Sequence, residues 1–239
     1  MRRVTRVCSD NVTLVDTNFL TQAGVDIGRS LYTLRRLREI GSETFENAID
    51  YLNSVRQLIW SKECALTIPE VETETKCLIG LVNQHVKFYG ERIKRCSKGR
   101  FEEEFDRDAE TLRLMATYAK SLTETLNHLG MIDTNKALHD VEAYESLVEM
   151  GVRFSNDLMR HYMRRKRKFR SPILNSATLY TDQKLVATSI TLARQGHDVE
   201  IITDDRDIPT LLERMANHPA CENGWEDKVT CLTARDALG

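Results

Sequence analysis

The chain has 239 residues, of which 41% are hydrophobic and 29% charged, and its formal net charge is −2 at pH 7. This size allows a buried core in one domain with an insertion, or in two small domains. No run approaches the roughly 18 consecutive apolar residues of a membrane span, and the N-terminus reaches Asp10 and Asp16 before a signal-peptide apolar stretch can form. A cytoplasmic protein without a membrane partner is therefore expected.

The first third of the chain alternates short apolar runs with helical patterns. Residues 12–16 (VTLVD) read as a strand, and a helical stretch follows to about residue 38. A helix over 43–62 is indicated by apolar residues at three-to-four spacing. These are Phe45, Ile49, Leu52, Val55 and Ile59. Residues 64–68 predict a short strand, and a helix from Pro69 through Val86 follows it.

The middle of the chain has a different character. From Phe88 to about Arg170 the pattern is charged helix with no strand candidate, broken near 97–99 and 130–134. We expect a helical insertion over 88–170 in a core made of 1–87 and 171–239. A helix over 182–195, a strand at 199–203, a helix around 209–217 and a strand at 229–233 complete that core. This alternation predicts an α/β three-layer sandwich with a central, mainly parallel sheet of four to five strands.

Acidic residues stand where the predicted strands end or the predicted helices begin. They are Asp16, Glu74, Asp182, Asp204, Asp205 and Asp207. Strand ends of a parallel sheet meet at one edge, so these acids are expected to converge. Two hard cations about 4 Å apart, held by oxygen ligands, can activate a water and stabilise a leaving oxygen at a phosphodiester. The pattern therefore predicts a metal-dependent nuclease.

Each acid also has a structural explanation. The segment Thr67 to Glu70 has the S/T-x-x-E pattern of a capping box, which makes Glu70 a helix cap rather than a ligand. Glu72 then points away, whereas Glu74 shares the face of Glu70 and can look toward the strand ends. Asp182 suits a helix dipole, and Asp204 or Asp207 suits the cap of the helix near Pro209.

Four segments resemble the PIN-domain nucleases in order and spacing: VTLVDTNFL, LTIPEVETE, DQKLVATSITLARQGHDVEIITDDRDI and VTCLTARDAL. This family consists of Mg²⁺- or Mn²⁺-dependent ribonucleases with a small doubly wound sheet. The resemblance covers both ends of the chain but not residues 88–170. It implies that Asp16, Glu74, Asp182 and Asp205 are the catalytic acids.

The resemblance assigns each position by a motif. Asp16 ends the first strand and is followed by Thr17 and Asn18. Glu74 comes three residues after the apolar Val71. Asp182 opens a D-x-x-L/I-x-A helix, and Asp205 completes T-x-D with Thr203. The implied metal ligands are Asp16, Asp182, Asp205 and Asp207, with Mg²⁺ or Mn²⁺ as cofactor. Whether Glu74 binds metal directly or through water stays open. Supporting roles fall to Thr17, Asn18, Thr203 and Asp204.

A basic block precedes the C-terminal part of the core. Residues 160–170 (RHYMRRKRKFR) contain seven Lys or Arg in eleven positions, together with Tyr162 and Phe169. Such a block suits a phosphate backbone with unstacked bases, and a solvated helix end is the alternative. The residues predicted to bind RNA are Arg164, Arg165, Arg167 and Lys168.

Other chemistries lack their signatures. The chain has no GxxxxGK[ST] loop, no GxSxG elbow and no HExxH helix, and its six cysteines have no zinc spacing. The favoured function is a Mg²⁺- or Mn²⁺-dependent endoribonuclease. Two alternatives stay open: an RNA- or protein-binding scaffold with little turnover, and a structure-specific DNA nuclease. A protein partner bound through 88–170 and a homodimer also stay open.

Overall fold

The computed structural model describes residues 2–4, 6–7, 9–21, 42–96, 102–163, 180–219, 221 and 224–239. Its centre is one six-stranded sheet in the order β1-β4-β3-β2-β5-β6, and every strand pair is parallel. The strands are β1 (Arg2–Val4), β2 (Asn11–Val15), β3 (Ala65–Thr67), β4 (Gly130–Ile132), β5 (Asp198–Ile202) and β6 (Val229–Leu232). The predicted α/β fold with a parallel sheet is confirmed, with six strands in place of four to five.

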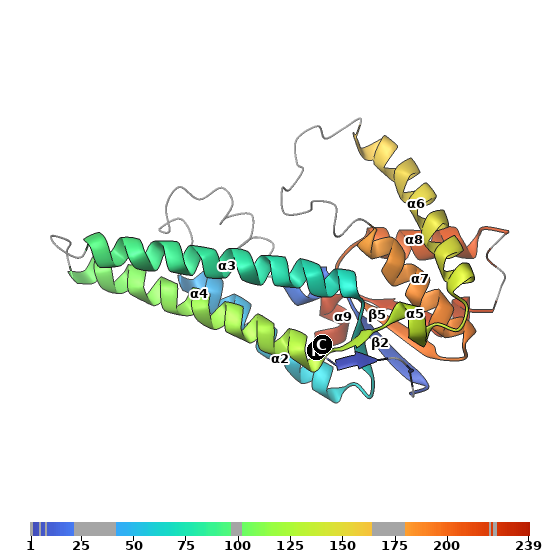
Figure 1. Ribbon diagram of the computed structural model, residues 1–239, viewed down its shortest axis with the longest axis horizontal. Helices are drawn as coiled ribbons and strands as arrows, with labels where there is room; N and C mark the ends of the chain where they lie inside the picture. Colours follow the sequence, from blue (N-terminus) through green and yellow to red (C-terminus); the bar gives the residue numbers. More distant parts are fainter. Residues whose placement is uncertain are drawn as a thin grey trace.

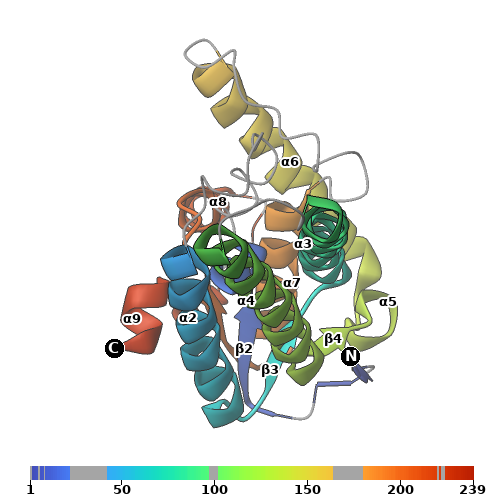
Figure 2. The ribbon, with the colours of Figure 1, turned by 90° about the vertical axis from the view of Figure 1, so that its left-hand side faces the viewer.

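Helices cover both faces of this sheet and make the three layers. They are α2 (Ser42–Ser61), α3 (Pro69–Cys96), α4 (Glu102–His128), α5 (Thr134–Ala137), α6 (Val141–Met163), α7 (Thr181–Arg194), α8 (Asp207–Ala216) and α9 (Ala234–Leu238). Figures 1 and 2 show α2, α3 and α4 on one side of the sheet and α6, α7 and α8 on the other. Residues 17–21 add a helical turn directly after β2. In the described part of the chain, no helix combines the length and hydrophobicity needed to cross a membrane.

The prediction that 88–170 contains no strand is wrong, because β4 lies in that segment between β1 and β3. A three-residue strand is too short to show alternation, and its pairing is set by its neighbours. Gly130 opens β4 at a close approach. A Cβ there would lie 2.6 Å from Leu66 Cδ2 and 3.0 Å from Val4 Cγ2.

The helix predicted to end at Val86 continues to Cys96, so the expected boundary at 87 and 88 falls inside α3. Helices α3 and α4 run side by side and project beyond the sheet (Figure 1). Helix α2 packs on α4 with its apolar stripe buried at Phe45, Leu52, Val55 and Ile59, while Ile49 is only partly buried.

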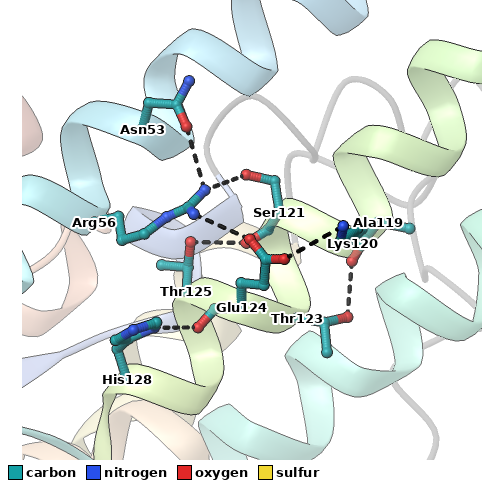
Figure 3. A network of polar contacts seen from close by, with 9 residues as sticks. All are labelled: Asn53, Arg56, Ala119, Lys120, Ser121, Thr123, Glu124, Thr125 and His128. Carbon is teal, nitrogen blue, oxygen red and sulfur yellow. Dashed lines mark hydrogen bonds and ion pairs between the residues drawn. The ribbon is translucent and has the colours of Figure 1, made fainter.

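A polar network ties α2 to α4 (Figure 3). The Arg56 guanidinium donates to Glu124 Oε2 at 3.0 Å and to Ser121 Oγ at 2.7 Å. It also reaches Asn53 Oδ1 on its own helix at 3.2 Å. Because this guanidinium is largely shielded from water, removing Glu124 would leave a poorly solvated positive charge on Arg56. The network therefore fixes how α4 lies on α2.

The order of the strands locates the ligand crevice of the fold. From β2 the chain moves outward to β3 and then to β4, and it next returns to β5 on the other side of β2 before β6. The direction of winding reverses between β2 and β5. In open α/β sheets, ligands bind outside the carboxyl ends of the strands at such a switch point. Asp16 follows β2 and the segment 203–205 follows β5, so both lie at this point.

Candidate functional site

Asp16 is the most buried acid of the site, with 1% of its surface exposed. Its carbonyl accepts the first hydrogen bond of the helical turn, from Leu20 N at 3.2 Å. Its carboxylate accepts from Thr17 N at 2.6 Å and from Thr203 Oγ1 at 2.7 Å. Burial raises the pKa of Asp16 to about 6, although these two hydrogen bonds oppose the rise. Asp16 therefore joins the ends of β2 and β5 as a carboxyl group that is costly to ionise.

Asp205 is held on the other side of the same crevice. Its Oδ2 accepts from Asn18 Nδ2 at 3.0 Å, and its Oδ1 accepts from Asp207 N at 2.8 Å. The Thr203 hydroxyl that donates to Asp16 also accepts from Asp205 N at 2.9 Å. Thr203 and Asn18 thus link the two carboxylates without bringing them into direct contact.

Glu74 lies in the second turn of α3 and accepts one hydrogen bond on each carboxylate oxygen. Thr17 Oγ1 donates to Oε2, and Thr181 Oγ1 donates to Oε1 at 2.7 Å. Glu74 therefore connects three helix starts: α3, the turn after β2, and α7. The sequence reasoning did not single out Thr181, although a hydroxyl residue directly before Asp182 at a helix start was the available signal.

The predicted capping box at Thr67 to Glu70 is wrong. Thr67 Oγ1 donates to the carbonyl of Val15 at 2.8 Å, which ties β3 to β2. The Glu70 carboxylate forms an ion pair with Lys184 of α7. Because α3 begins at Pro69, Thr67 lies one residue too early to be its N-cap. Glu72 pairs with Lys76 one turn further along α3, at 2.7 Å.

Asp182 lies in the first turn of α7, and its pKa is raised to about 8. Burial is the largest cause, and the negative charges of Asp16, Asp205, Glu74 and Asp207 add to it in that order. The pKa of Asp207 is also raised, by burial and by the charge of Asp205. Carboxylates from five positions thus act electrostatically on one another at the switch point.

Asp204 faces a different element from its neighbour Asp205. Its Oδ1 accepts from Ala234 N at 2.9 Å, which places it at the start of α9 rather than at the helix near Pro209. Its charge raises the pKa of the Tyr51 hydroxyl, which is already raised by burial. The described contacts of Asp204 therefore support the position of α9. The predicted RNA-binding residues Arg164, Arg165, Arg167 and Lys168 lie outside the described residues.

The donor chemistry of this site fits a hard divalent cation, because the side chains offer carboxylate and hydroxyl oxygens. Three of the acids, Asp16, Asp182 and Asp207, also have raised pKa values, and a nearby cation relieves the repulsion that contributes to them. Within the described ranges, however, no three His, Cys, Asp or Glu side chains are grouped closely enough to hold a metal ion. The Thr and Asn hydrogen bonds account for the spacing between the carboxylates. The arrangement is a set of oxygen donors rather than a closed cage.

Comparisons of the chain with protein-family models, with characterised proteins and with solved structures found no match.

Proposed function

We propose that this protein is a Mg²⁺- or Mn²⁺-dependent nuclease that hydrolyses phosphodiester bonds in RNA. The observation that carries the proposal is the convergence of Asp16, Glu74, Asp182 and Asp205 at the switch point of a parallel sheet. Burying several carboxylates together raises the free energy of the folded protein. A scaffold gains nothing from clustered carboxylates that offsets this unfavourable free energy. A site that binds a cation and a phosphodiester requires such a cluster. The motif resemblance to the PIN-domain nucleases supports the same function.

In this proposal Asp16, Asp182 and Asp205 hold the cation, with Asp207 assisting. When bound, Mg²⁺ or Mn²⁺ lowers the pKa of a water and neutralises charge on a phosphate. Thr203 orients Asp16 through its 2.7 Å hydrogen bond, and Asn18 orients Asp205. Glu74 fixes the hydroxyls of Thr17 and Thr181. We propose RNA rather than DNA as the substrate because the PIN-domain nucleases, which the motifs resemble, act on RNA.

The second candidate is an RNA- or protein-binding scaffold with little turnover. It is favoured by the hydrogen bonds that already occupy both oxygens of Glu74 and Asp16 and by the absence of a compact metal group among the described side chains. In this case the acids would hold segments together, and cleavage would be absent with every cation.

The deciding experiment is incubation of purified protein with end-labelled RNA and DNA of the same sequence in Mn²⁺, Mg²⁺ or EDTA. We expect cleavage of RNA in Mn²⁺ or Mg²⁺, none in EDTA, and none with Asp16→Asn or Asp182→Asn. Glu72→Gln is the control, because Glu72 lies on α3 two residues before Glu74 but pairs with Lys76 outside the site. Wild-type rates in either aspartate variant contradict the assignment. Preferential cleavage of DNA selects the DNA nuclease instead.

A further inference from the structure

Tyr180, the residue immediately before α7, has an unusual backbone and an exposed ring. Its φ is 77°, and within the described ranges it is the only residue other than glycine with a positive φ. The residue as a whole is 45% exposed. The carbonyl of Tyr180 accepts a hydrogen bond from Lys184 N at 2.9 Å, so Tyr180 is the N-cap of α7 and its position is fixed by that helix.

Tyrosine is a poor choice for this position on local grounds. N-cap positions favour Ser, Thr, Asp and Asn because their short side chains accept hydrogen bonds from the helix start, and Tyr180 makes no such bond. The left-handed backbone region disfavours a bulky side chain, and glycine or asparagine usually occupies such positions. Residues that contradict local preferences in this way cluster at functional sites.

The position of Tyr180 sets it apart from the other exposed large hydrophobic side chains of the described residues. Trp60 lies at the end of α2, just before β3 begins, which is the opposite edge of the sheet. Phe88 lies in the C-terminal third of α3, with its ring centroid 5.2 Å from that of Tyr89. Only Tyr180 adjoins the acids, since Thr181 donates to Glu74 and Asp182 follows.

We propose that the Tyr180 ring stacks on an unpaired base of single-stranded RNA whose phosphate lies at the acid site. The inference rests on the proposed function, and it adds strandedness to the choice of substrate. An exposed ring can take a base of any identity, because every base has a π-face. Tyrosine has only two side-chain torsions to immobilise. A base within a duplex is already stacked on its neighbours, so Tyr180 gives no gain with double-stranded RNA.

The test measures binding rather than cleavage. Fluorescence anisotropy at low salt, in EDTA and in Ca²⁺ as a hard cation for the acid site, records the affinity for a labelled single-stranded RNA and for its duplex, with wild type and with Tyr180→Phe, Tyr180→Ala and Tyr180→Gly. Stacking on one base corresponds to a loss of roughly 5- to 150-fold when the ring is removed. We expect this loss with Ala and Gly for the single strand only, and near wild-type affinity with Phe. Phe88→Ala is the matched control and should leave both affinities unchanged.

The glycine variant separates binding from folding, because it removes the ring and also relieves the left-handed backbone. Its urea midpoint should be equal to or above that of wild type. Unchanged single-strand affinity in Tyr180→Ala, an equal loss for the duplex, or no single-strand binding by wild type overturns the inference. If Tyr180→Ala binds and cleaves like wild type, the nuclease assignment stands and this inference fails. If single-strand binding depends on Tyr180 but no cation supports cleavage, the stacking inference stands and the nuclease assignment fails.

Discussion

Raising the pH should destabilise the metal-free protein, and Asp182 should cause much of the effect. Its pKa is about 8 in the folded state against an ordinary 3.8. Between these values the folded state binds more protons than the unfolded state, so the free energy of unfolding falls as the pH rises. The loss of stability from Asp182 is absent below pH 4, where both the folded and the unfolded state are protonated, and it is complete above pH 8.

The magnitude follows from the size of the pKa difference. About four pKa units at 1.36 kcal/mol each set a ceiling of about 6 kcal/mol. The Asp182 side chain is partly exposed, and solvent screening lowers the expectation to about half of that, about 3 kcal/mol. Asp16, with a pKa of about 6, adds a smaller loss in the same direction, complete above pH 6. Asp182→Asn removes the titrating group and one of the repelling charges.

The assay is urea unfolding in EDTA at pH 5, 6, 7 and 8 for wild type and Asp182→Asn. We expect the variant to gain stability relative to wild type steadily from pH 5 to pH 8, because histidines and other groups titrate alike in both proteins. Adding Mg²⁺ at one hundred times its dissociation constant should restore about 2.7 kcal/mol to wild type alone. Parallel stability curves for the two proteins would refute the coupled acid site.

Three further outcomes can be checked. Glu74→Gln should cost about 1–2 kcal/mol in urea unfolding and lower the cleavage rate, because two hydroxyls lose a carboxylate acceptor, whereas Glu72→Gln should cost no more than about 0.5 kcal/mol. Gly130→Ala should cost about 1–3 kcal/mol through its approach to Leu66, and an unchanged urea midpoint would contradict the tight β4 packing. Replacing the predicted RNA-binding residues by Ala should raise KM for RNA and leave kcat nearly unchanged. The slope of log affinity against log salt concentration should become shallower by about 0.7 for each lost phosphate contact. An unchanged slope would mean that the basic block at 160–170 is a solvated helix end. These residues are Arg164, Arg165, Arg167 and Lys168.

The strands that the sequence predicted are those with β-branched runs of their own. The predicted ends of β2 and β5 lie within one residue of the observed ends, because the mainly apolar runs VTLV and VEII are bounded by polar residues on both sides. β1 (RRV) and β4 (GMI) carry no such pattern, since three residues pair only where a neighbouring strand receives them. The starts of α2, α3, α7 and α8 were predicted within two residues, because the apolar stripe of an amphipathic helix is a local feature of the sequence.

The partners of the acids depended on distances that no local pattern contains. Glu70 looked like a cap because of a four-residue motif, but α7 brings Lys184 within reach of its carboxylate. Asp204 and Asp205 are adjacent in sequence, and only the fold sends one to α9 and the other to Asn18. The motifs could indicate which residues are acidic at strand ends, whereas the hydrogen bond from Thr181 to Glu74 depends on how α7 lies relative to α3.

The position of β4 also limits how the long helical arm can be changed. Helix α4 leads almost directly into a strand that separates β1 from β3, so excising 88–170 as a unit would remove a sheet member and leave β1 without its neighbour. The arm can instead be shortened from its far end, where α3 finishes and α4 starts. Because the two helices run side by side, matched numbers of turns must be removed from each to keep their contacting faces in register.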